Sequence, residues 1–207
     1  MKRCVGLASG VLLAGIAQAG QGVILGDQYA GNDGIAWTLG YSFTAKSTIQ
    51  ATELMAWDDL GDGFVSGSLA VGLWDSAGNL LASTTVSGTD TLTADNFRSR
   101  AITPVTLIAG QTYIVAAENR EDSYHYDYNN TRVVAPEITW LSDRYIEGAN
   151  LAFPTYGYGQ NSGVNGWYGG NFGFTAIPLS PAASMGLGGL ACVGGVSVVR
   201  RRKLARV

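Results

Sequence analysis

The segment Trp37-Thr38-Leu39-Gly40-Tyr41-Ser42-Phe43 is the stretch that best defines the fold of this 207-residue chain. Its large apolar side chains occupy every second position, at Trp37, Leu39, Tyr41 and Phe43. A period of two places such side chains on one face of a β-strand, where they can pack against a core. The segment therefore predicts a strand with one apolar face.

The same alternation recurs along much of the chain. It is seen in Leu69, Val71 and Leu73; in Ala82, Thr84 and Val86; in Val105 and Leu107; in Tyr113, Val115 and Ala117; and in Phe172 and Phe174. Turn-forming triplets separate many of these runs, namely Asn32-Asp33-Gly34, Gly61-Asp62-Gly63, Ala77-Gly78-Asn79 and Ala109-Gly110-Gln111. No convincing helical period occurs between residues 23 and 175. The pattern predicts an all-β domain, a single β-sandwich with jelly-roll or immunoglobulin-like connectivity.

The first 19 residues have the features of a signal peptide. Lys2 and Arg3 form a basic start, residues 5–16 form an apolar core, and Ala17-Gln18-Ala19 has the small-x-small pattern of a cleavage site. We therefore expect export, with the mature chain beginning at Gly20.

An apolar segment also lies near the other end of the chain. Residues 182–199 carry no charge, and Arg200-Arg201-Arg202-Lys203 follows directly. A helix of 18 residues is about the shortest that crosses a hydrocarbon core of roughly 30 Å, and the cations hold that end in the cytoplasm. The alternative is a buried helix of the folded domain. We predict three regions: a signal peptide (1–19), a β-sandwich domain (20–176), and a linker, hydrophobic helix and basic tail (177–207).

Between these ends the chain is strongly acidic. Residues 20–176 contain six Lys and Arg against 16 Asp and Glu, a net charge of −10. Nucleic acid and anionic lipid would be repelled by such a surface, so neither is an expected partner. Both cysteines, Cys4 and Cys192, lie outside this region, so its stability must come from the core alone.

Catalytic signatures are sparse. His125 is the only histidine, and no Gly-x-Ser-x-Gly nucleophile motif is present. A histidine in such a tyrosine-rich stretch is more often a surface or hydrogen-bonding residue. Paired carboxylates for glycoside hydrolysis stay open, because sequence does not show which acids share a cleft. We expect a protein that is not an enzyme and has no cofactor other than a candidate calcium ion.

That candidate calcium site lies in an acidic turn. Asp58, Asp59 and Asp62 place three carboxylates within five residues, and oxygen ligands are what Ca²⁺ prefers. Asp58 and Asp62 are the strongest ligand candidates. The spacing does not match a helix-loop-helix calcium loop. The alternative is an acidic hairpin tip between strands that end at Trp57 and begin near Gly67.

Aromatic residues in stretches rich in Gly and Asn suggest a carbohydrate site. Flat aromatic faces stack on the apolar side of a pyranose ring, while neighbouring amides and carboxylates bind its hydroxyl groups. The candidate contacts are Tyr156, Tyr158, Trp167 and Tyr168, with Tyr124, Tyr126 and Tyr128 in a second predicted loop. The alternative for all of them is core packing or pinning of the loops. The tryptophans in or beside strand patterns are assigned to the core instead: Trp37, Trp57 and Trp74.

The tail resembles the PEP-CTERM class of bacterial sorting signals. The features that carry the resemblance are a proline motif, an apolar span and a terminal arginine cluster: Pro178, Pro181, Arg200, Arg201 and Arg202. Where the usual signal has Pro-Glu-Pro, this chain has Pro-Leu-Ser-Pro, which is closer to the Val-Pro-Leu-Pro-Ala variant. The resemblance implies an exosortase-like processing enzyme, transient anchoring in the inner membrane through the tail, and a final place at the cell surface or in the extracellular matrix of a bacterium.

The region from about residue 36 to 118 is similar to a β-sandwich domain of unknown function often found in exported bacterial proteins. The similarity rests on an ordered set of motifs that includes Trp57-Asp58-Asp59 and Val71-Gly72-Leu73-Trp74-Asp75, and Gly170-Asn171-Phe172 before the tail also resembles such proteins. We therefore expect a non-catalytic surface or matrix protein, associated with exopolysaccharide or biofilm. The alternative is a carbohydrate-binding module, with or without assistance from calcium.

Overall fold

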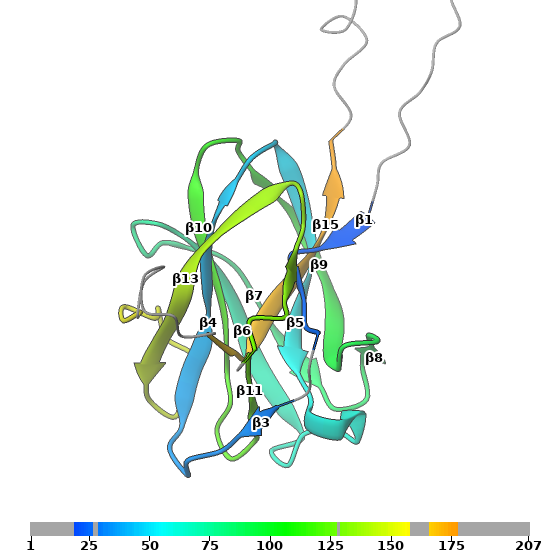
Figure 1. Ribbon diagram of the computed structural model, residues 1–207, viewed down its shortest axis with the longest axis vertical. Coiled ribbons are helices and arrows are strands. Elements are labelled where there is room, and N and C mark those ends of the chain that lie inside the picture. Colours follow the sequence, from blue (N-terminus) through cyan, green and yellow to red (C-terminus); the bar gives the residue numbers. More distant parts are fainter. Residues whose placement is uncertain (1–18, 27–28, 128, 158–165, 178–207) are drawn as a thin grey trace, which may run out of the picture. The chain divides into compact units, whose positions relative to one another are not determined.

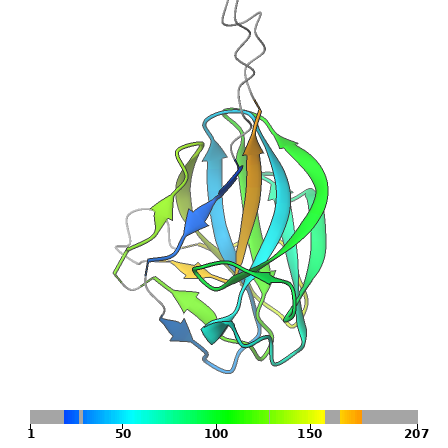
Figure 2. The same ribbon diagram turned by 90° about the vertical axis from the view of Figure 1, so that its right-hand side faces the viewer.

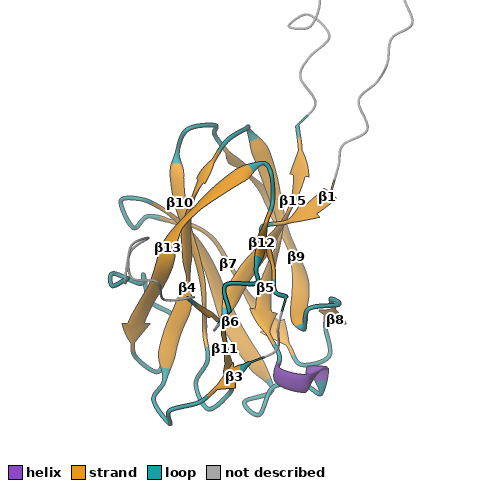
Figure 3. Ribbon diagram, in the orientation of Figure 1, coloured by secondary structure: helices purple, strands orange, loops and turns teal. Residues whose placement is uncertain are grey.

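The computed structural model describes residues 19–26, 29–127, 129–157 and 166–177 (Figure 1). These residues form an all-β domain whose sheets pack together, as the sequence predicts. The short helix in Figure 3 is a single 3-10 turn, Asp59–Gly61. Within the described residues, no helix has the length and apolar character needed to cross a bilayer. Residues 1–18 of the predicted signal peptide and the sorting residues Pro178, Pro181, Arg200, Arg201 and Arg202 lie outside this range.

Two five-stranded antiparallel sheets make up most of the domain. The first has the order β1 (Ala19–Gln21), β15 (Gly170–Ala176), β5 (Ile49–Trp57), β9 (Phe97–Leu107), β8 (Thr91–Leu92). The second has the order β13 (Ile138–Glu147), β4 (Trp37–Ala45), β10 (Thr112–Glu118), β6 (Ser68–Asp75), β7 (Leu80–Ser87). Figure 2 shows β15, β5 and β9 side by side in orange, cyan and green.

Two smaller sheets lie beside the large ones. One consists of β14 (Trp167–Tyr168), β11 (Tyr124–Tyr126) and β3 (Ala30–Gly31), and the other of β12 (Val133–Val134) and β2 (Val23–Ile24). The two stretches predicted as long loops, residues 123–130 and 153–172, thus contain β11 and β14, which pair with each other. That assignment was wrong because strands of two or three residues are too short to show a period.

One hydrophobic core lies between the two large sheets. Phe43 of β4 stacks on Phe172 of β15 with ring centroids 4.7 Å apart, which joins the second sheet to the first. Tyr41, Phe43 and Phe172 are fully buried. The alternation read from β4, β6, β7, β9, β10 and β15 therefore reports the core-facing side of each strand. The prediction of strands in these segments is confirmed.

The strand β13 was not recognised in the sequence. Its pairing with β4 changes register between Trp140 and Ser142, where an irregularity interrupts the period of two. β13 forms the edge of the second sheet beyond β4 and carries Tyr145, which contributes to the site described below.

The outer face of the second sheet is covered in part by the segment after β13. Trp74 and Ile114 form a second buried cluster there, against which Leu151 and Phe153 pack. Trp74 and Phe153 meet edge to face, with centroids 6.1 Å apart. The assignment of Trp57 and Trp74 to the interior is confirmed, since their exposed fractions are 1% and 4%.

The two large sheets are in close contact where β15 begins. A Cβ atom on Gly170 would lie 2.6 Å from the backbone nitrogen of Ala117 in β10. Only glycine permits this approach. The close contact at Gly170 fixes the path of the chain immediately after Trp167 and Tyr168, and so positions β14.

Candidate functional site

The short strands β11 and β14 sort their aromatic side chains into two sets. His125 pairs with Tyr168 and Tyr126 pairs with Trp167. Because successive residues of a strand point to opposite faces, Tyr126 and Trp167 share one face, and His125 and Tyr168 share the other. Tyr126 and Trp167 are half-buried, whereas His125 and Tyr168 are fully buried.

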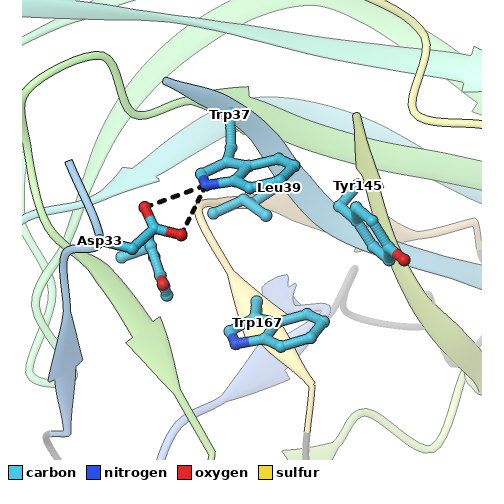
Figure 4. Close-up of a pocket in the computed structure, with 6 residues that line it drawn as sticks. Asp33, Trp37, Leu39, Tyr145 and Trp167 are labelled. Carbon is cyan, nitrogen blue, oxygen red and sulfur yellow. Dashed lines mark hydrogen bonds between the residues drawn. The ribbon is translucent and has the colours of Figure 1, made fainter. Parts of the chain in front are cut away.

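The accessible face of this small sheet contributes to a pocket of about 230 Å³, which we call the aromatic pocket. Its walls come from the start of β4, the turn before it, β11, β13 and β14 (Figure 4). The lining residues are Asp33, Trp37, Leu39, Tyr124, Tyr145 and Trp167.

A larger depression of about 420 Å³, the adjoining groove, shares Tyr124 and Trp167 with the aromatic pocket. It extends over β3 and is otherwise lined by Tyr29, Ala30, Gly31 and Tyr126. The close contact of Tyr124 with β3 depends on Gly31, because a Cβ atom there would lie 2.7 Å from the Tyr124 ring. The pocket and the groove together are called the aromatic cleft.

Four rings of the cleft and its border form a continuous row. Tyr145 lies 5.7 Å from Tyr156 and 5.6 Å from Trp167, and Trp167 lies 6.0 Å from Tyr126, measured between ring centroids. Tyr156 is 60% exposed and joins the row through a bridge between its backbone and that of Tyr145. Rings at these separations make favourable aromatic contacts and hold one another in place.

One carboxylate is fixed at the pocket wall. Both oxygens of Asp33 accept from the indole Nε1 of Trp37 at 3.1 Å, and the backbone N–H of Ile35 donates to the same side chain at 3.1 Å. Gly34, with a φ of +74°, makes this turn possible. Burial raises the pKa of Tyr124, and the negative charge of Asp33 raises it further. Tyr124 is therefore a neutral phenol at physiological pH.

The predicted carbohydrate contacts have different positions in the structure. Trp167 lies in the cleft, and Tyr156 is at its border. Tyr168 is fully buried, with its ring 5.7 Å from that of Tyr41, and burial raises its pKa. Tyr168 thus cannot contact a ligand at the surface, and its assignment as a contact was wrong. Tyr158, like Tyr128, lies outside the described residues.

Several residues of the cleft were not singled out in the sequence. Trp37 was assigned to the core, yet it is half-buried and lines the pocket, because it stands at the first position of β4, where the sheet ends. Tyr145 lies beside it because β13 pairs with β4, with Tyr145 opposite Leu39. Asp33 was noted only as part of a turn.

The acidic turn proposed for calcium has another role at Asp58. This carboxylate is 1% exposed, and it accepts from Arg98 Nε at 2.5 Å and from the backbone N–H of Gly63 at 3.0 Å. No group of three His, Cys, Asp or Glu side chains that could hold a metal occurs among the described residues. The structure thus does not bring Asp58, Asp59 and Asp62 together as such a group, and Asp58 pairs with Arg98 instead.

The alternative of an acidic hairpin tip was wrong. β5, which ends at Trp57, and β6, which begins at Ser68, belong to different sheets, so the turn crosses from one sheet to the other. Arg98 holds this crossing by donating to the carbonyl oxygens of Gly61 at 2.7 Å and Asp90 at 2.9 Å.

His125 is not a surface residue. It is fully buried, and its ring meets Trp57 and Tyr168 edge to face, with centroids 5.4 and 6.1 Å apart. These contacts place the His125 ring on the buried face of the small sheet.

Comparison with known proteins places this domain in a family. The family described as "Domain of unknown function (DUF4082)" matches residues 25–164, about two thirds of the chain. The chain belongs to this family. The DUF4082 match includes every residue of the aromatic pocket except Trp167, which follows the matched range by three positions. No curated protein and no solved structure matches the chain.

Proposed function

We propose that this protein is an exported, non-catalytic cell-surface or extracellular-matrix protein whose domain binds carbohydrate in the aromatic cleft. The observation that carries the proposal is the row of rings Tyr156, Tyr145, Trp167 and Tyr126. Within the row, the pairs Tyr156–Tyr145 and Trp167–Tyr126 have interplanar angles of 31° and 30° and give two surfaces on which pyranose rings of a polymer can stack.

Polar groups beside the row supply the second requirement of a sugar site. The Asp33 carboxylate is held in a fixed position, and the phenol of Tyr124 stays neutral. An acceptor and a neutral donor next to a stacking surface can orient the hydroxyl groups of a sugar. The acidic domain, with its net charge of −10, favours neutral or cationic polymers over anionic ones.

We also infer that the two large sheets form a jelly-roll sandwich. Without the edge strands β8 and β13, the two sheets contain eight strands, which we number one to eight in chain order: β1, β4, β5, β6, β7, β9, β10 and β15. The strand orders of the two sheets are then 1-8-3-6 and 2-7-4-5. This is the order produced by two Greek keys, and β13 is an additional edge strand beside β4. Lectin domains include jelly rolls, but this is an analogy between folds and assigns no residue.

A polysaccharide array probed with the purified protein tests the proposal. Binding to at least one neutral or cationic polysaccharide is expected, and Trp167→Ala should weaken it by about five- to thirtyfold, because one stacking ring is worth about 1–2 kcal/mol. Trp140→Ala is the matched control, since Trp140 is half-buried and lies against Arg132, outside the cleft. Equal losses in the two variants, or no binding by the wild type, would refute a sugar site in the cleft.

Export and sorting through the tail form the other part of the proposal. Its support is the sequence: the signal peptide pattern of residues 1–19 and the PEP-CTERM-like arrangement of Pro178, Pro181 and the arginine cluster. An exosortase-like enzyme is the expected partner. Replacement of Arg200, Arg201 and Arg202 by Gln should move protein from the membrane fraction to the medium. Unchanged fractionation would contradict a role for the cluster in retention.

A further inference from the structure

The walls of the aromatic pocket meet at right angles. Trp37 and Tyr145 are 5.9 Å apart with an interplanar angle of 79°, and Tyr145 and Trp167 are 5.6 Å apart at 82°. Figure 4 shows Trp37 and Trp167 on opposite sides of the opening, with Tyr145 on a third side and the Asp33 carboxylate facing in from a fourth. Mutually perpendicular rings surround a small group, whereas a sugar ring is bound by stacking on a flat surface.

The walls of the aromatic pocket attract positive charge. The face of an aromatic ring carries the negative part of its quadrupole, so a cation among several rings is stabilised by each ring whose face it meets. Asp33 adds a full negative charge at the wall, and its orientation is set by Trp37 Nε1. Among the residues that the structure describes, no lysine or arginine lines the pocket.

The volumes of the two depressions fit different parts of one ligand. About 230 Å³ is below the usual range of sites that take a whole small molecule, roughly 300–1,000 Å³. The aromatic pocket therefore suits a head group. The adjoining groove of about 420 Å³ shares two of its walls and has room for the remainder of the ligand.

We propose that the aromatic pocket is a cage for the protonated amino group of an amino sugar, and that the adjoining groove binds the neighbouring sugar units. This inference rests on the proposed function, and it specifies the polysaccharide as one with free amino groups. An N-acetylated sugar lacks the charge, and a uronic acid would be repelled by Asp33.

The test compares two oligosaccharides of equal length, oligomers of glucosamine and of N-acetylglucosamine, by titration calorimetry at a pH that keeps the amine protonated. The glucosamine oligomer should bind about tenfold more tightly, and added salt should reduce this preference. Asp33→Asn should remove most of it while preserving the shape of the pocket.

Asp75→Asn is the matched control. Asp75 ends β6 and, like Asp33, accepts backbone N–H groups of the turn that follows it, from Ala77 and Asn79 at 2.9 Å, but it lies outside the cleft. Asp75→Asn should leave the preference unchanged, and loss of the preference in this variant too would overturn the role of Asp33.

The remaining outcomes separate the two proposals. Equal binding of the two oligomers, or a preference that survives Asp33→Asn, would overturn the cage and leave a neutral sugar site. If neither oligomer binds and no polysaccharide on the array binds, the proposed function is overturned as well. Binding of tetramethylammonium without binding of the oligomers would retain the cation cage and overturn its assignment to a sugar.

Discussion

Replacement of Asp58 by Ala should destabilise the domain strongly, and the structure sets the magnitude. The substitution leaves the guanidinium of Arg98, whose side chain is 10% exposed, without its counter-charge. Removal of one partner from a buried ion pair typically costs about 3–5 kcal/mol, because the remaining charge is neither solvated nor compensated. For a domain whose total stability is about 5–15 kcal/mol, this is a large part of the free energy of unfolding.

Urea denaturation followed by tryptophan fluorescence measures the effect. With an m-value of about 2 kcal/mol per M, the midpoint for Asp58→Ala should fall by roughly 1.5–2.5 M. Asp62→Ala is the control, since Asp62 is exposed in the same turn and its loss should change stability by less than about 0.5 kcal/mol. The double variant Asp58→Ala, Arg98→Met should recover part of the loss, because it leaves no buried charge behind.

The same experiment separates the ion pair from a calcium site. If Asp58 acts through Arg98, a chelator should leave the wild-type midpoint unchanged. A midpoint that falls on addition of chelator, or equal losses in Asp58→Ala and Asp62→Ala, would refute the ion pair as the main role of Asp58.

Two further predictions concern other buried and surface polar groups. Asn171→Ala should cost about 1–3 kcal/mol, because buried Tyr41 Oη donates to Asn171 Oδ1 at 2.6 Å and loses this acceptor. The Val23 carbonyl loses the Asn171 Nδ2 donor at 2.6 Å but keeps Gln21 Nε2 at 2.8 Å. Unchanged hydrogen-exchange protection around Val23 would argue against this. Arg100 donates to Asp90 at 2.7 and 2.9 Å and lowers the pKa of its carboxyl. This stabilisation is present at neutral pH and is lost as the pH falls through the lowered pKa. Asp90→Asn should thus be less stable than the wild type by up to about 1 kcal/mol at pH 7 and equal to it in strong acid, as checked by thermal melting. A difference that persists in acid would exclude the ion pair as its cause.

The strands were predictable from the sequence because their signal is local. In β4, side chains two positions apart share an environment, so Tyr41 and Phe43 could be assigned to the same core face without knowledge of the partner strands. The same rule failed where the backbone is irregular, as at the bulge of β13, and where strands have only two or three residues, as in β11 and β14.

The site was less predictable because its parts are distant in sequence. Tyr145 reaches Trp37 only through the register of β13 on β4, across 108 positions. Asp58 and Arg98 are 40 positions apart, and nothing near Asp58 indicates a buried cation. A gathering of aromatic residues could be seen in the sequence. Which of two neighbours, Trp167 or Tyr168, faces the cleft depends on the pairing of β14 with β11.

The position of the cleft relative to the ends of the domain bears on both proposals. Ala19 of β1 pairs with Thr175 near the end of β15, so the chain enters and leaves the domain side by side. Trp167 precedes the other end of β15, and a strand of seven residues spans roughly 20 Å. Within the described domain, Ile177 therefore lies at the end of β15 that is away from Trp167. Variants of the cleft and variants of Arg200, Arg201 and Arg202 change different parts of the chain, so the two proposals can be tested independently.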